Sequence, residues 1–84
     1  MLTIKVLGAG CANCKRLESE TSAALDAAHI PYQLEKVTEY ADIMAYGVMT
    51  TPALVINEKV VSSGRIPARS RIIELAREFE ATSG

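Results

Sequence analysis

The sequence predicts an α/β fold with the element order β-α-β-α-β-β-α, in which a four-stranded mixed sheet is flanked by three helices. Short apolar runs bounded by glycine, proline or polar turns indicate strands, and apolar residues at every third or fourth position indicate helices. A helix between the first two strands implies a right-handed crossover that leaves those strands parallel. The last two strands are separated by a tight turn, which predicts an antiparallel hairpin. Parallel and antiparallel pairs together make the expected sheet a mixed one.

The first half of the chain contains a strand, a long helix and a second strand. Residues 2–7 are mostly apolar and end at Gly8, as in a buried strand. Residues 11–29 predict a helix that ends before Pro31. Residues 32–37 alternate apolar and polar side chains, which indicates the second strand. The buried stripe of the helix is predicted to contain Cys14, Leu17, Thr21, Ala24, Leu25 and Ala28.

A short helix is predicted after the second strand. It covers residues 39–46, with Ile43 and Met44 on its inner side and Gly47 as the residue that ends it. Pro52 is then expected to open the third strand.

The third and fourth strands are predicted to form a hairpin. They cover residues 53–56 and 59–62, and Asn57 and Glu58 make the tight turn between them. Gly64 is expected to end the fourth strand.

Pro67 is well suited to the first turn of the last helix, which is expected to run to about residue 81. Its inner face is predicted to contain Ile72, Ile73, Ala76 and Phe79. Arg69 and Arg71 lie near the positive end of this helix, where cations are mildly unfavourable. These two arginines are therefore a local misfit in the pattern.

The composition limits the classes of function. Eighty-four residues, of which 49% are hydrophobic, are expected to form one domain over residues 1–84 and to act as a monomer. A net charge of −1 gives no electrostatic basis for binding nucleic acid. No apolar run approaches the roughly 20 residues of a membrane span. The first residues lack the basic stretch and long apolar core of a secretion signal, so we expect a cytoplasmic protein.

The only two cysteines, Cys11 and Cys14, lie at the start of the long helix. The unpaired amides and the dipole of a first helical turn stabilise a thiolate there, so Cys11 is the predicted nucleophile. Cys14 falls on the buried stripe and is the predicted resolving thiol. In this mechanism Cys11 attacks a disulfide, and Cys14 then attacks Cys11 and releases the reduced target. Cys11 and Cys14 are therefore candidate catalytic residues.

Two other functions for the cysteine pair stay open. A closed zinc site needs four ligands, whereas this chain adds only His29, roughly 22 Å from Cys14 along the helix. Two thiols nevertheless suit copper(I), so a soft-metal carrier is one alternative. A binding module with an inert cysteine pair is the other. No resident metal and no cofactor are predicted.

Cys11-Ala12-Asn13-Cys14 after a strand, followed much later by Thr51-Pro52, resembles the thioredoxin and glutaredoxin superfamily. The run from Tyr46-Gly47-Val48 through Pro52 to Leu54 is similar to the thioredoxin motif Tyr-Gly-Ile/Val, three residues, Pro, any residue, Leu. The C-A-N-C motif and Ser63-Gly64-Arg65 resemble small thioredoxin-like proteins of archaea and bacteria. The resemblance covers essentially the whole chain.

The resemblance implies a thioredoxin-like fold and a small dithiol–disulfide oxidoreductase. Its substrates would be disulfides in proteins or small molecules, and its electron donor would be of the thioredoxin-reductase type. It also implies that the bond before Pro52 is cis and that Pro52 faces the cysteines. Thr51 would offer its backbone to an extended substrate segment, which makes Thr51 and Pro52 the candidate substrate-binding residues.

The sequence departs from this family at several positions. It has no tryptophan, and Gly10 precedes the first cysteine where thioredoxins have that residue. Lys5 is the only charged residue in the first strand, so the buried acid of the thioredoxin central strand has no evident counterpart. Arg65 follows a single Gly64, where the glutathione-binding pattern of glutaredoxins has two glycines.

Overall fold

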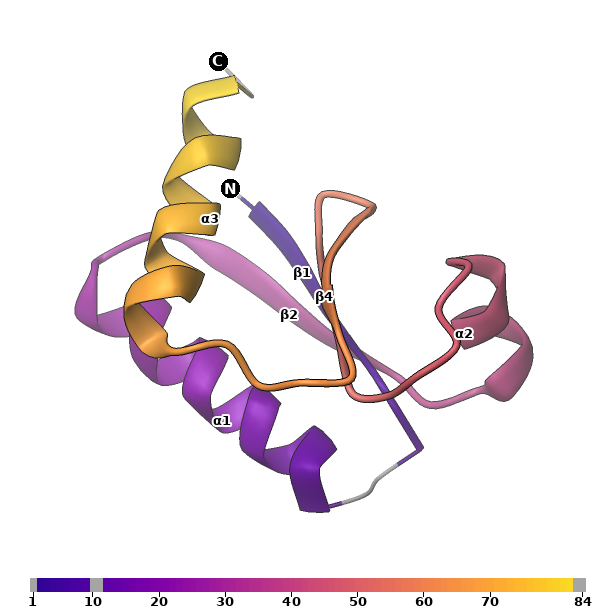
Figure 1. Ribbon diagram of the computed structural model, residues 1–84. Helices are drawn as coiled ribbons and strands as arrows, with labels where there is room; N and C mark the ends of the chain where they lie inside the picture. The colour runs from indigo at the N-terminus through magenta and orange to yellow at the C-terminus, as the bar shows by residue number, and fades with distance from the viewer. Residues whose placement is uncertain (1, 10–11, 83–84) are drawn as a thin grey trace.

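The computed structural model describes residues 2–9 and 12–82, without the side chain of Thr82 (Figure 1). Its elements follow the predicted order, and the predicted α/β fold class is confirmed. They are β1 (Leu2–Leu7), α1 (Ala12–Ala27), β2 (Tyr32–Val37), α2 (Tyr40–Ala45), β3 (Ala53–Ile56), β4 (Lys59–Ser63) and α3 (Arg69–Thr82).

The sheet is mixed, with the strand order β2-β1-β3-β4. β1 and β2 are parallel, from Leu2 opposite Tyr32 to Leu7 opposite Val37. β1 is antiparallel to β3, and β3 is antiparallel to β4. The crossover through α1 and the hairpin therefore form as the sequence predicts. This topology places β1 and β3 in the centre of the sheet.

The helices cover both faces of the sheet. In Figure 1, α1 and α3 lie on one side of it and α2 lies on the other. Two hydrophobic clusters fill the two sides. Alternate residues of β1 belong to the α1/α3 cluster, whereas Leu7 belongs to the α2 cluster with Ile43. The β1 residues of the α1/α3 cluster are Leu2, Ile4 and Val6.

Most helix faces lie as predicted. The α1 stripe is buried from Cys14 to Leu25. His29, at φ 57, follows α1, and the amides of His29 and Ile30 donate to the carbonyls of Asp26 and Leu25. This pair of hydrogen bonds is the Schellman arrangement that ends a helix. The predicted helix over residues 11–29 therefore extended too far.

Two predictions about the other helices were wrong. Met44 is 50% exposed, whereas Ile43 is buried at 4%. A helix of only two turns is too short for its sequence pattern to fix which of two neighbours points inward. The last helix begins at Arg69, because the first helical bond runs from the Ile72 amide to the Ala68 carbonyl. Pro67 thus precedes the helix instead of lying in its first turn.

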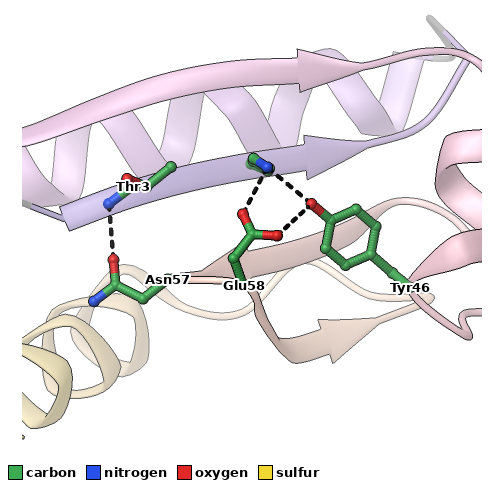
Figure 2. A network of polar contacts seen from close by, with 5 residues as sticks. Thr3, Tyr46, Asn57 and Glu58 are labelled. Carbon is green, nitrogen blue, oxygen red and sulfur yellow. Dashed lines mark hydrogen bonds and ion pairs between the residues drawn. The ribbon is translucent and has the colours of Figure 1, made fainter.

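The β3–β4 turn is joined to the start of β1. Asn57 and Glu58 both have positive φ values, 49° and 70°, as a two-residue hairpin turn of the favoured hand requires. The Thr3 amide donates to Asn57 Oδ1 at 2.9 Å, and the Asn57 amide donates to the Thr3 carbonyl at 2.8 Å. Figure 2 shows Asn57 beside Thr3. The turn thereby contacts the central strand as well as its own hairpin.

The same turn supplies the carboxylate of a polar network on the α2 face of the sheet (Figure 2). Lys5 Nζ lies 2.6 Å from Glu58 Oε1 and donates to Tyr46 Oη at 2.9 Å. Tyr46 Oη donates to Glu58 Oε2 at 3.0 Å. The hydrogen bonds from Lys5 and then from Tyr46 lower the pKa of Glu58. Hydrogen bonds to Glu58 and Tyr46 likewise raise the pKa of Lys5. The network explains how a lysine fits into the central strand.

Lys5→Met is expected to lower the free energy of unfolding at neutral pH. Because the pKa of Glu58 is lower in the folded state, its contribution is complete above its ordinary pKa of 4.5 and is lost as the pH falls through the lowered value. The raised pKa of Lys5 preserves its contribution up to at least its ordinary pKa of 10.5. Urea unfolding at pH 7 and at pH 3 would measure the effect. A difference between variant and wild type that is equal at both pH values would contradict it, and Lys59→Met on exposed β4 is the control.

Candidate functional site

Three segments meet at the end of β1. A Cβ atom built on Gly8 would overlap Cys14 Sγ, would lie 3.1 Å from Cys14 Cβ and would lie 3.9 Å from Thr51 Cβ. The Gly8 amide donates to the Val37 carbonyl at 2.9 Å, which continues the pairing of β1 with β2. The backbone at Gly8 therefore packs against the sulfur of Cys14, and Thr51 lies beside both. Glycine is needed here because any side chain would occupy the position of the sulfur.

Cys14 lies in the first turns of α1 and is only 5% exposed. It is disulfide-bonded, and the part of the chain that the structure describes contains no free cysteine. Its burial agrees with the position predicted for it on the inner stripe of the helix. Cys11, the other predicted site cysteine, lies outside the described residues.

The segment before β3 contributes Thr51 and Pro52. The bond between them is cis, the geometry that the family resemblance implied. Thr51 is exposed and Pro52 is buried. The Pro52 carbonyl accepts a hydrogen bond from the Gly64 amide at 2.9 Å. A Cβ on Gly64, whose φ is +72°, would lie 2.7 Å from Thr50 Oγ1. The segment after β4 is thus packed closely against the cis-proline segment.

A groove of about 500 Å³ lies between these segments and α1. Asn13, Arg16 and Glu20 line it from α1, Thr51 and Pro52 line it from the cis-proline segment, and residues 64–69 form its remaining wall. The groove brings both predicted substrate-binding residues next to the first turns of the helix that carries Cys14. The sequence motifs do not predict these charged walls, because the residues that form them come from distant parts of the chain.

A second, smaller pocket of about 100 Å³ lies behind Cys14. Glu18 and Lys36 are among the residues that line it, together with Gly8 and Cys14. Lys36 Nζ lies 3.7 Å from Glu18 Oε2, and the Glu18 side chain is 28% exposed. The family resemblance points to an acid on the central strand, where Lys5 is the only charged residue, and Glu18 was not among the predicted site residues. Glu18 could have been found from its spacing, because it lies four residues after Cys14 on the same helix face.

The described residues contain no cluster of three or more histidine, cysteine, aspartate and glutamate side chains that could hold a metal ion. No helix within residues 2–9 and 12–82 is long and apolar enough to cross a membrane.

Comparisons with known proteins agree with this geometry. A family model described as "Thioredoxin domain" matches residues 2–77. A protein named "Thioredoxin" from Methanothermobacter thermautotrophicus is 31% identical over 72 residues, which cover 86% of this chain and 94% of the relative. A protein with the same name from Methanocaldococcus jannaschii is 27% identical over 79 residues, which cover 94% of this chain and 91% of the relative.

Proposed function

Because the chain belongs to the thioredoxin family, we propose that it is a small dithiol–disulfide oxidoreductase that reduces disulfides in proteins or small molecules. The observation that carries this proposal is the packing of Cys14, a buried disulfide cysteine, against Gly8 and beside Thr51 of a cis-proline segment. Cys11 is the nucleophile and Cys14 is the resolving thiol. The whole chain, residues 1–84, acts as one domain in the cytoplasm, without a resident cofactor.

The reaction consists of two thiol–disulfide exchanges. The Cys11 thiolate attacks one sulfur of the substrate disulfide, forms a mixed disulfide with it, and displaces the other sulfur as a thiolate. Cys14 then attacks the Cys11 sulfur, which forms the Cys11–Cys14 disulfide and displaces the second substrate thiolate. Two electrons pass from the dithiol to the substrate. An electron donor of the thioredoxin-reductase type returns the pair to the reduced state.

The helix assigns different tasks to the two thiols. Cys11 directly precedes Ala12, the first residue of α1, where the helix amides and dipole stabilise a thiolate. Cys14 is buried against Gly8. A buried thiol keeps its proton unless an acceptor lies close, because burial disfavours the charged form. The second exchange therefore requires a proton acceptor near Cys14.

Glu18 is the acceptor that we assign to this step. Glu18 lines the pocket behind Cys14, and Lys36 Nζ lies 3.7 Å from its carboxylate oxygen Oε2. A pocket of about 100 Å³ has room for water, which can carry the proton between the thiol and the carboxylate. We therefore assign to Glu18 the role of the buried acid, which has no counterpart on the first strand of this sequence.

Glu18→Gln is expected to slow the second exchange by on the order of 10²-fold, the lower end of the range for general acid–base groups. The mixed disulfide should then accumulate during turnover and be visible by mass spectrometry after acid quenching. Asp26→Asn, at the other end of α1, is the charge-matched control. An unchanged rate of the second exchange in Glu18→Gln would rule out this assignment.

The proposed function is tested by equilibrating the protein with redox buffers and assaying reduction of a protein disulfide. We expect a reversible two-electron couple and turnover that depends on Cys11, with Cys11→Ser inactive. A Cys11 thiol that resists alkylation at neutral pH would instead indicate an inert binding module. Tight copper(I) binding without turnover would indicate a metal carrier. Either of these results would overturn the proposal.

A further inference from the structure

The groove beside the cysteine helix is more basic than the chain as a whole. The protein has a net charge of −1, yet Arg16, Arg65 and Arg69 line this groove against a single carboxylate, that of Glu20. The three arginines come from α1, from the segment after β4 and from the start of α3. The fold therefore gathers cations from distant parts of the sequence around the cis-proline segment. We refer to this surface as the arginine groove.

One of the three arginines is paired inside the groove. Arg69 Nε lies 2.5 Å from Glu20 Oε2, and this contact lowers the pKa of Glu20. The ion pair offsets the unfavourable position of Arg69 at the positive end of α3. It also joins α3 to α1 within the lining of the groove. The charge of Arg69 is thus paired with that of Glu20.

Arg16 and Arg65 are the cations that remain. Both are exposed, and neither forms a salt bridge among residues 2–9 and 12–82, although the charge of Arg16 also helps to lower the pKa of Glu20. Arg65 follows Gly64, whose amide is bonded to the Pro52 carbonyl, so its backbone is held next to the cis-proline segment. Arg16 comes from α1, two residues after Cys14. Two arginines without a salt bridge therefore line the same groove as Thr51 and Pro52.

We propose that the arginine groove selects disulfides in acidic protein segments, with carboxylates flanking the substrate cysteine contacting Arg16 and Arg65. This inference rests on the proposed oxidoreductase function and adds its substrate class. Thr51 lines the groove together with Arg16 and Arg65, so a segment bound along Thr51 would have its neighbouring residues near these two arginines. Carboxylates there meet two guanidinium groups, whereas lysine residues meet like charge. Charge complementarity at such a rim acts on selection and on the rate of association.

The test uses three peptides that contain the same internal disulfide and differ only in flanking residues, which are glutamate, serine or lysine. For the wild-type protein we expect kcat/KM to be about fivefold to tenfold higher for the glutamate peptide than for the serine peptide, and lowest for the lysine peptide. Raising the ionic strength should reduce this preference, because salt screens exposed charges.

The double variant Arg16→Gln/Arg65→Gln should bring the ratio between glutamate and serine peptides close to one. Arg77→Gln removes an exposed arginine of α3 that does not line the groove, and should keep the wild-type ratio.

Equal kcat/KM values for all three peptides with wild-type protein would overturn the inference while leaving the oxidoreductase function standing. No turnover of any peptide would overturn the oxidoreductase function itself. A preference for the lysine peptide, or a ratio unchanged in the double variant, would also overturn the inference.

Discussion

Replacing Cys14 by serine is expected to stop turnover and to leave Cys11 joined to the substrate in a mixed disulfide. A serine hydroxyl stays protonated at neutral pH and cannot displace the substrate thiolate, so the first exchange occurs without the second. Incubation of the reduced variant with a protein disulfide should give a covalent adduct of one-to-one stoichiometry. The adduct should appear in intact-mass spectra and disappear after treatment with dithiothreitol.

The buried position of Cys14 makes a second variant necessary. Cys14 is 5% exposed, and a buried hydroxyl that makes no hydrogen bond destabilises a fold. Cys14→Ala avoids that hydroxyl and should trap the same adduct. Cys11→Ser is the control and should form none. Turnover at the wild-type rate by either Cys14 variant would exclude Cys14 as the resolving thiol, and an adduct formed by Cys11→Ser would exclude Cys11 as the nucleophile.

Gly8→Ala is expected to lower the rate of disulfide reduction by on the order of 10²-fold. The added methyl group would occupy the position of Cys14 Sγ, so the sulfur or the end of β1 must move. Displacing a reacting group by about 1 Å is enough to reduce a rate by that amount. Crowding of this kind in a packed region also destabilises a fold by about 1 to 3 kcal/mol. Single-turnover kinetics and urea unfolding would separate the two effects.

Gly47→Ala is the matched control for the effect on stability. Gly47 has φ +76° and no heavy atom within 4 Å of a built Cβ, so an alanine there adds backbone strain without crowding. It should destabilise the protein by about 1 kcal/mol and leave the chemistry of the cysteines unchanged. If Gly8→Ala keeps full activity, the backbone at Gly8 does not position Cys14. If both variants lose activity equally, the effect is one of stability alone.

The fold was accessible from the sequence because its element boundaries carry strong local signals. Gly47 after α2 and the Asn57-Glu58 turn both adopt the positive φ values that their positions require. Cys14 was placed correctly on the buried face of α1 by helical periodicity alone. The same method failed at Met44, where the helix is too short to define a face.

The assembly of the site was harder to predict, because it depends on packing between distant segments. Gly8 carries no side chain, and nothing in its local sequence indicates that the Cys14 sulfur lies directly against it. Arg69 was recognisable only as a misfit at the start of α3, since its partner Glu20 lies on another helix. Local patterns report on local structure, whereas these contacts are set by the tertiary arrangement.

The contact between Gly8 and Cys14 determines which positions near the site can be changed in protein engineering and which cannot. At Gly8 every substitution adds atoms where the Cys14 sulfur already lies, so this position offers no room for redesign. Arg16 and Arg65 are exposed and lack ion-pair partners among the described residues, so other side chains can replace them without repacking the core. Libraries that aim to retarget this scaffold to new disulfides should therefore randomise the walls of the arginine groove and leave the end of β1 constant.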